Sequence, residues 1–181
     1  DITRYCYDDN PDWCDLYGGL YTWNTVMQGQ SSSNSNPSGV QGICPDGWHV
    51  PSDAEWTELT NYLINNYDDF TSSNVGNKLK SCRQVDSPLG GCNTSDHPRW
   101  NSNDSHFGTD DFDFSALPGG YRNPSGGFYF LGAVGYWWSS TEYSSSHAWF
   151  RRMSRFDGSV GRGNSNNKTY GFGLRCVRDL D

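Results

Sequence analysis

The sequence predicts a loop-rich domain with short strands and few helices. Three observations support this: Gly, Ser and Asn are abundant and charged residues make up only 19%, one segment carries strong helical signals, and aromatic residues fall in short alternating runs. Apolar content is modest at 34%, but aromatic residues reach 15%. Because large rings build a core from few residues, we expect one domain over residues 1–181.

The clearest predicted helix begins after Ser52. Ser52 is a favourable N-cap, and Glu55 three residues later completes a capping box. An apolar stripe with helical spacing follows, and its members are Trp56, Leu59 and Leu63. A second, shorter helix is predicted over residues 75–79. His49, between Trp48 and Val50, is interpreted as a packed, hydrogen-bonded histidine and not as a ligand.

Short strands are predicted over residues 20–23, 128–132 and 148–154. Side chains alternate between the two faces of a strand. In the last of these strands, one face carries Trp149, Arg151 and Met153. The other face carries Phe150, Arg152 and Ser154. We interpret the first face as a scaffold and the second as part of a recognition surface.

Six cysteines predict disulfides and an oxidising location. They are Cys6, Cys14, Cys44, Cys82, Cys92 and Cys176. Six cysteines allow fifteen pairings, and short separation favours Cys6–Cys14 and Cys82–Cys92, which leaves Cys44–Cys176. No Cys-x-x-Cys motif is present, so a zinc site is not expected.

The net charge is −8, with the acidic residues concentrated before residue 144 and a basic excess after it. An acidic total argues against a nucleic-acid partner, and no apolar run is long enough for membrane insertion. Clustered carboxylates at Asp8, Asp9 and Asp12 suit a calcium ion, but the EF-hand spacing is absent. No metal or other cofactor is therefore expected, with calcium as the alternative.

The chain begins Asp1-Ile2-Thr3 without a signal peptide. We expect either that one has been removed or that the protein leaves the cell by another route, such as on a virus particle. Together with the cysteines, this predicts a protein that is extracellular or on a virion or cell surface.

Five strings in order carry a resemblance to a known family. They are GICPDGWHVPSDAEWTEL, FSALPGGYR, GYWWSSTE, AWFRR and GFGLRCVRD. The chain resembles the Fibrobacter succinogenes major paralogous domain family, which is similar to the formylglycine-generating-enzyme branch of the C-type lectin fold. The resemblance implies an α+β domain with two helices, a small antiparallel β-sheet and extensive loops. It also implies a Cys44–Cys176 disulfide, because C-type lectin folds tie their first helix to their last strand.

Members of this fold serve as variable proteins of diversity-generating retroelements. In these systems the adenines of AAC codons are mutated, so that one asparagine codon comes to encode many residue types. The resemblance thus implies a variable ligand-binding region over residues 135–178. Positions compatible with such codons are His147, Phe150, Arg152, Ser154, Arg155, Phe156, Asp157, Gly161, Asn164 and Tyr170. Trp149, Met153 and Lys168 cannot arise in this way and would belong to the scaffold. Variable positions must be exposed on a backbone that other residues hold.

The predicted function is therefore a display protein that binds a protein or glycan on a target cell surface. The alternative is a lectin or adhesin of fixed specificity, although the Glu-Pro-Asn and Gln-Pro-Asp triplets of calcium-dependent lectins are absent. Enzyme activity is not expected. Only Cys176 lies beyond Cys92, and the histidines have no nucleophile-elbow motif beside them.

Overall fold

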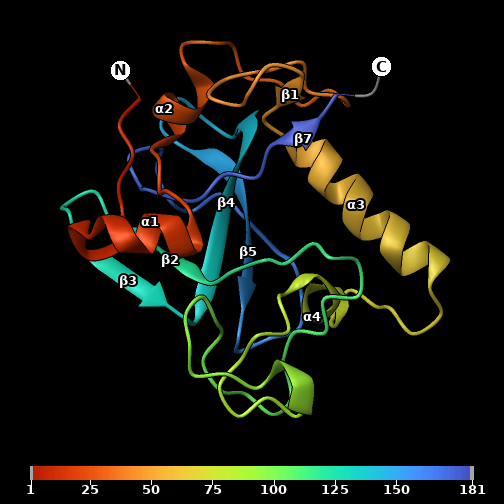
Figure 1. Ribbon diagram of the computed structural model, residues 1–181. Helices are drawn as coiled ribbons and strands as arrows, with labels where there is room; N and C mark the ends of the chain where they lie inside the picture. Colours follow the sequence, from red (N-terminus) through yellow and green to blue (C-terminus); the bar gives the residue numbers. More distant parts are fainter. Residues whose placement is uncertain (1, 180–181) are drawn as a thin grey trace.

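A five-stranded sheet lies at the centre of the fold in the computed structural model, which describes residues 2–179 (Figure 1). Its strand order is β3-β2-β4-β5-β6, and only the β2–β4 pair is parallel. The strands are β2 (Gly119–Arg122), β3 (Phe128–Leu131), β4 (Val134–Glu142), β5 (Ala148–Ser154) and β6 (Gly161–Gly163). A second, antiparallel sheet pairs β1 (Trp48–His49) with β7 (Val177–Arg178).

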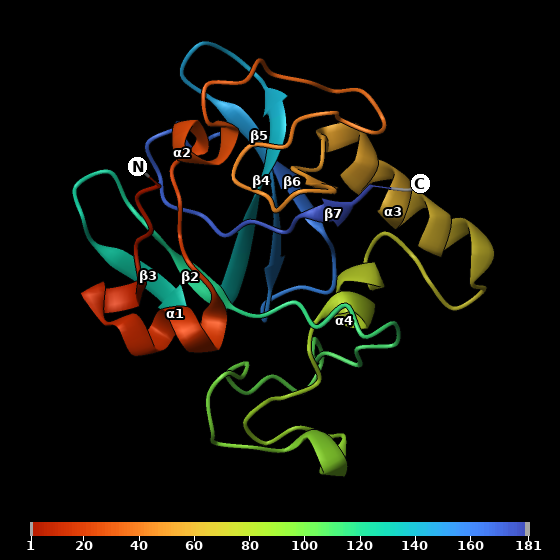
Figure 2. The same cartoon turned by 45° about the horizontal axis from the view of Figure 1, so that its top comes forward.

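Short helices surround the sheet, and α3 is the longest of them. The α-helices are α1 (Pro11–Tyr17), α2 (Trp23–Met27), α3 (Asp53–Asn66) and α4 (Val75–Leu79). Two 3₁₀ turns span Tyr7–Asp9 and Gly90–Cys92. Figure 2 shows α1 beside β2 and β3, α3 on the opposite side next to β7, and much of residues 80–115 as an irregular lobe. The mixed α+β class predicted from the sequence is confirmed.

The predicted start of α3 is confirmed, and the predicted capping box forms there. The Ser52 hydroxyl accepts from the Glu55 N–H at 3.1 Å, and the Glu55 carboxylate accepts from the Ser52 N–H at 2.8 Å. Trp56 and Leu63 are buried, so the apolar stripe faces the core. The second predicted helix is confirmed as α4, over the residues expected.

The predicted strand over residues 20–23 is wrong. Leu20 and Tyr21 make only isolated bridges, and Trp23 is the first residue of α2. The reason is local: the Thr22 hydroxyl accepts from the Thr25 N–H and caps a helix there. With α1, this adds two short helices to the two that were predicted. The sheet also differs from the prediction, because Gly120 of β2 pairs in parallel with Gly135 of β4.

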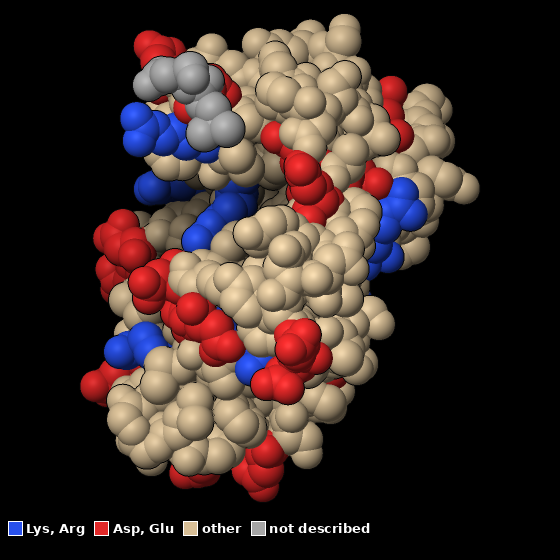
Figure 3. Space-filling view, turned by 90° about the vertical axis from the view of Figure 1, so that its right-hand side faces the viewer, with Lys and Arg blue, Asp and Glu red and all other residues tan. Residues whose placement is uncertain are grey.

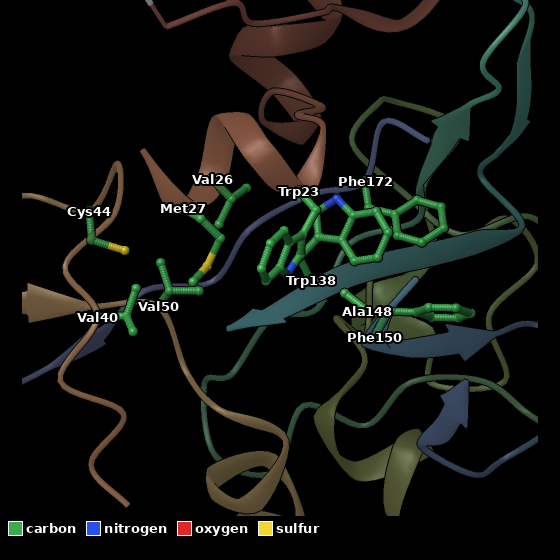
Figure 4. Packing of buried hydrophobic residues seen from close by; sticks show 10 residues of the cluster. All are labelled: Trp23, Val26, Met27, Val40, Cys44, Val50, Trp138, Ala148, Phe150 and Phe172. Carbon is green, nitrogen blue, oxygen red and sulfur yellow. The ribbon is translucent and has the colours of Figure 1, made fainter. Parts of the chain in front are cut away.

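Two hydrophobic clusters form the core, one on each face of β4 and β5. Trp137 and Trp138 are neighbours in β4 and so point to opposite faces. Trp138 is fully buried, its ring centroid lies 4.4 Å from that of Phe172, and its indole N–H donates to the Tyr21 carbonyl at 2.9 Å. Figure 4 shows this cluster, with Trp23 of α2 beside Trp138. The double tryptophan thus anchors both clusters to one strand.

Three disulfides staple the loops, and all three predicted pairings are confirmed. They are Cys6–Cys14, Cys44–Cys176 and Cys82–Cys92. The first and third close short loops, whereas the second joins residues 132 apart in the sequence. This bridge fastens the segment before β1 to the segment before β7.

Buried ions join α3 to the sheet. Arg151 of β5, which is 2% exposed, forms an ion pair with Asp53 at the start of α3. Arg162 of β6 contacts the same carboxylate, with Nη2 2.7 Å from Oδ2, and its guanidinium lies 3.5 Å from the centre of the Trp149 ring. Burial alone would raise the pKa of Asp53, but the two guanidinium groups outweigh it and lower that pKa. The scaffold role predicted for the Trp149–Arg151–Met153 face therefore includes a charged link.

Candidate functional site

Two of the predicted variable positions are buried, which corrects the expectation that all of them are exposed. Phe150 is 3% exposed in the cluster around Trp138, and Ser154 is 2% exposed. The reason is that β5 lies between β4 and β6 and that side chains such as Phe172 cover the face on which Phe150 lies. Alternation along the strand predicts which side chains share a face, but not which of them other side chains cover.

The other predicted positions lie at the two ends of β5, within it, and in β6 and the segment that follows. Arg155, Phe156 and Asp157 form the turn after β5, where Phe156 is 58% exposed and the Arg155 guanidinium lies 4.5 Å from the centre of its ring. His147 precedes β5 and forms a bridge with Asn167. The remaining positions, each exposed or partly exposed, are Arg152, Gly161, Asn164 and Tyr170.

A row of residues crosses the whole five-stranded sheet at the level of Arg152. Tyr129 pairs with Tyr121, Gly120 with Gly135, Tyr136 with Arg152, and Arg152 with Gly161. Residues that pair directly across strands share a face. The members of this cross-strand row are, from β3 to β6, Tyr129, Tyr121, Tyr136, Arg152 and Gly161.

Five aromatic rings gather around the centre of this row, and we call them the aromatic face. They are Tyr121, Tyr129, Phe130, Tyr136 and Tyr170. The ring centroid of Tyr121 lies 5.4 Å from those of Tyr129 and Tyr136, 5.7 Å from that of Tyr170 and 5.9 Å from that of Phe130. Offset and edge contacts at these distances are favourable. Because the rings also hold each other, their positions are largely set before any ligand arrives.

The outer part of the aromatic face is open to solvent. Tyr129 is 45% exposed and Phe130 is 49% exposed. Phe130 has a φ of +67°, which is unusual for a bulky residue. Such backbone conformations are strained and cluster at functional positions. In Phe130 this backbone conformation places a large apolar ring about half exposed to water.

Two tyrosines of the aromatic face, Tyr121 and Tyr136, have raised pKa values. Burial raises the pKa of Tyr121, and the neighbouring hydroxyl groups of Tyr136, Tyr170 and Tyr129 raise it further. Burial also raises the pKa of Tyr136, although the charge of Arg152 opposes this. The hydroxyl groups of Tyr121 and Tyr136 therefore remain protonated at neutral pH. Within residues 2–179, Arg152 forms no ion pair.

Sequence reasoning identified Arg152, Gly161 and Tyr170 in this site but missed the tyrosines of β2, β3 and β4. Residues 128–132 were predicted only as a strand, and Tyr121 and Tyr136 entered only as members of the strings that carry the family resemblance. The available signal was the density of aromatic residues in those runs. Strand order and register, which place them beside Arg152, depend on contacts between distant segments and leave no local pattern.

A cavity lies elsewhere, between α3 and the β1–β7 sheet. Its volume is about 930 Å³, and Trp56, Leu59 and Phe114 contribute to its apolar lining. Figure 3 shows this side of the molecule, with Lys and Arg side chains set back in a hollow. His49 lies at its edge, with Nε2 2.6 Å from Glu55 and Nδ1 2.6 Å from Asp179. The interpretation of His49 as a packed, hydrogen-bonded side chain is confirmed.

Among residues 2–179, no group of three or more Asp, Glu, His or Cys side chains is arranged to hold a metal ion. The acidic run Asp8–Asp12, considered for calcium, forms a 3₁₀ turn and the start of α1. Within the same residues, no helix combines the length and apolar character that crossing a membrane requires.

The fold and its surfaces define a disulfide-linked α+β domain with a solvent-exposed aromatic surface on its central sheet. The chain belongs to the Fibrobacter succinogenes major domain family, whose sequence model matches residues 1–178. This confirms the family predicted from the five strings. No curated protein and no solved structure matches the chain.

Proposed function

We propose that this chain is a ligand-binding display domain, related to C-type lectins, that acts outside the cell or on a virion or cell surface. Its aromatic face, together with Arg152, contacts a protein or glycan on a target cell. The observation that carries the proposal is the cross-strand row, in which three tyrosines and an arginine lie side by side on a sheet. Tyrosine and arginine dominate binding hot spots.

The core residues, the buried ion pair and the disulfides that hold the cross-strand row in place support a binding role. Met153 and Trp138 fill the core on the two faces of the sheet, and the Arg151–Asp53 pair links β5 to α3. Three disulfides constrain the loops. A surface that is already ordered loses less conformational entropy on binding. The same rigidity lets exposed side chains change without loss of the fold.

We further propose that the codon-compatible positions that are exposed or partly exposed vary between copies of the gene, as in a diversity-generating retroelement. They are His147, Arg152, Arg155, Phe156, Asp157, Gly161, Asn164 and Tyr170. Phe150 and Ser154 are not part of this set, because substitution of a buried side chain would destabilise the core. Variation would then alter one end of the cross-strand row and the separate turn after β5.

Sequencing the same locus from many cells of one population tests the variability. We expect substitutions concentrated at these eight positions, with Phe150, Trp149, Met153 and Lys168 unchanged. Phe150 provides the sharpest control, because it passes the codon test but lies in the core. Identical copies, or changes spread evenly along the chain, would contradict the proposal.

Binding by the aromatic face is tested with a labelled domain on glycan and surface-protein arrays. Replacement of Tyr129 by Ala removes an exposed ring of the row, so we expect at least about a tenfold loss of signal, typical of a hot spot. Tyr62→Ala is the matched control, since Tyr62 is 59% exposed but lies on α3. Equal binding by both variants and the unmodified domain would exclude the aromatic face.

The second candidate is a lectin of fixed specificity. The exposed rings of Tyr129 and Phe130 favour it, because flat aromatic surfaces suit stacking against sugar rings. Uniform gene copies combined with a glycan-array signal would support this function. Varied copies at the exposed positions would support variable display instead.

A further inference from the structure

We propose that the ligand of the aromatic face in this chain is an anionic glycan, whose carboxylate or sulfate group binds Arg152 while its sugar rings lie along the tyrosines. This inference rests on the proposed function and specifies the chemistry of its ligand. It follows from the charge, the donor groups and the size of the site.

The ion pairing of Arg152 differs from that of its neighbours. Arg151 and Arg162, whose side chains lie on the opposite face of the sheet, both pair with Asp53. Arg152 is exposed and, among the described residues, has no carboxylate within ion-pair distance. A guanidinium group presents a planar fork of donors that matches carboxylate and sulfate-like oxyanions. The site therefore has an available cation in a protein whose net charge is −8.

The tyrosines beside Arg152 add hydrogen-bond donors to the site, and Gly161 leaves room for the Arg152 side chain. The ring centroids of Tyr136 and Tyr170 lie 5.4 Å and 5.7 Å from that of Tyr121, and the hydroxyl groups of both raise its pKa. On the other side of Arg152, a Cβ at Gly161 would lie 2.9 Å from the Arg152 side chain. A glycine there lets this side chain lie across β6, and the row as a whole favours an acceptor-rich ligand.

The size of the site favours a glycan over a protein. A standard protein interface uses roughly 20–30 residues on each side. The aromatic face and the cross-strand row together comprise seven residues. Their strands are spaced about 4.8 Å apart, so three steps from Tyr129 to Arg152 span roughly 14 Å. A short oligosaccharide fits this length, with apolar ring faces against Tyr129 and Phe130 and an acidic group at Arg152.

The test uses an array of matched oligosaccharides in neutral, sialylated, uronate-containing and sulfated forms, followed by titration calorimetry. We expect at least about a tenfold preference for an acidic form, as hydrogen bonds to charged groups provide. Arg152→Gln should abolish this preference and retain weak binding of the neutral form. Tyr129→Ala should weaken the neutral and acidic forms alike.

Two control variants remove the same groups elsewhere. Arg178→Gln removes an exposed arginine of β7, and Tyr62→Ala removes an exposed tyrosine of α3. Both should bind as the unmodified domain does, and melting curves should show that every variant is folded.

The outcomes separate this inference from the proposed function. Three outcomes overturn the anionic-glycan inference alone. They are equal binding of the neutral and acidic forms, no binding of any acidic glycan, and unchanged binding by Arg152→Gln. Preference for a sulfotyrosine peptide also overturns it, in favour of a protein ligand. If Tyr129→Ala leaves all binding unchanged, the proposed function itself fails. A response limited to sialylated and uronate forms identifies a carboxylate, and one limited to sulfated forms identifies a sulfate.

Discussion

At the scale of single residues, Phe150 and Phe156 show how differently one residue type behaves at the two ends of a short segment. Phe150 contacts Phe172, with ring centroids 5.0 Å apart, inside the cluster around Trp138. Phe156 lies in the turn after β5 and contacts Arg155. Both pass the same codon test, so only their environments distinguish a core position from a variable one.

This pair gives a matched stability test. Phe150→Ala should reduce the free energy of unfolding by about 3–5 kcal/mol, because a buried ring leaves a cavity. Phe156→Ala should change it by less than about 0.5 kcal/mol, since the ring is exposed. Urea denaturation measures both. A large loss for Phe156→Ala would place that side chain in the core and remove it from the proposed variable set.

Lys80 is a second residue whose role only the structure reveals. Its side chain is fully buried, and Nζ donates to the carbonyls of His106, Ser154 and Asp157 at 2.6–3.0 Å. Burial lowers its pKa to about 8. The lysine ties the irregular lobe to the turn after β5, and so holds the backbone next to Phe156.

At the scale of elements, His49 joins three of them. It belongs to β1, and its ring contacts Glu55 in the first turn of α3 and Asp179 just beyond β7. Burial lowers the pKa of His49, but hydrogen bonds and charge from the two carboxylates outweigh this, so the pKa is raised above 6.5. The charged form therefore stabilises the packing of β1, β7 and α3.

The sign of the pH dependence follows from this shift. Because the folded state holds the proton more tightly than the unfolded state, the stabilisation is fully present below about pH 6.5 and is lost as pH rises through the folded pKa. We expect the melting temperature of the unmodified domain to fall over that range. In His49→Gln this part of the pH dependence should be absent, and in His147→Gln it should remain. Parallel curves for all three proteins would show that His49 does not contribute.

At the scale of the whole molecule, the disulfides differ in how much chain they constrain. Cys44–Cys176 closes a loop of 132 residues, whereas Cys82–Cys92 closes one of 10. In the chain-entropy description, a longer loop restricts the unfolded state more. The long bridge also fixes the segment next to β7 to the segment before β1, far from the cross-strand row.

Paired alanine variants test this difference. Replacement of both Cys44 and Cys176 should lower the free energy of unfolding by roughly 5 kcal/mol, and replacement of both Cys82 and Cys92 by roughly 2.7 kcal/mol. Urea denaturation under non-reducing conditions measures each loss. A greater loss for the short loop would mean that local packing, and not loop closure, dominates the contribution of these bridges.

The sequence by itself determined the features that depend on a short run of residues or on the spacing of one residue pair. The capping box of Ser52 and Glu55 placed the start of α3, and cysteine separation indicated the disulfide partners. The strand at residues 20–23 was predicted wrongly because its alternating pattern competed with an N-cap at Thr22, which needs one hydrogen bond to form.

Only the tertiary structure decided which surface is open and which side chains meet there. Phe150 and Arg152 share a face of β5, yet Phe172 and Trp138 cover the first and leave the second exposed. Tyr121, Tyr129 and Tyr136 meet Arg152 because strand order and register bring distant segments together. These contacts depend on packing over long sequence separations, so no local pattern of residues encodes them.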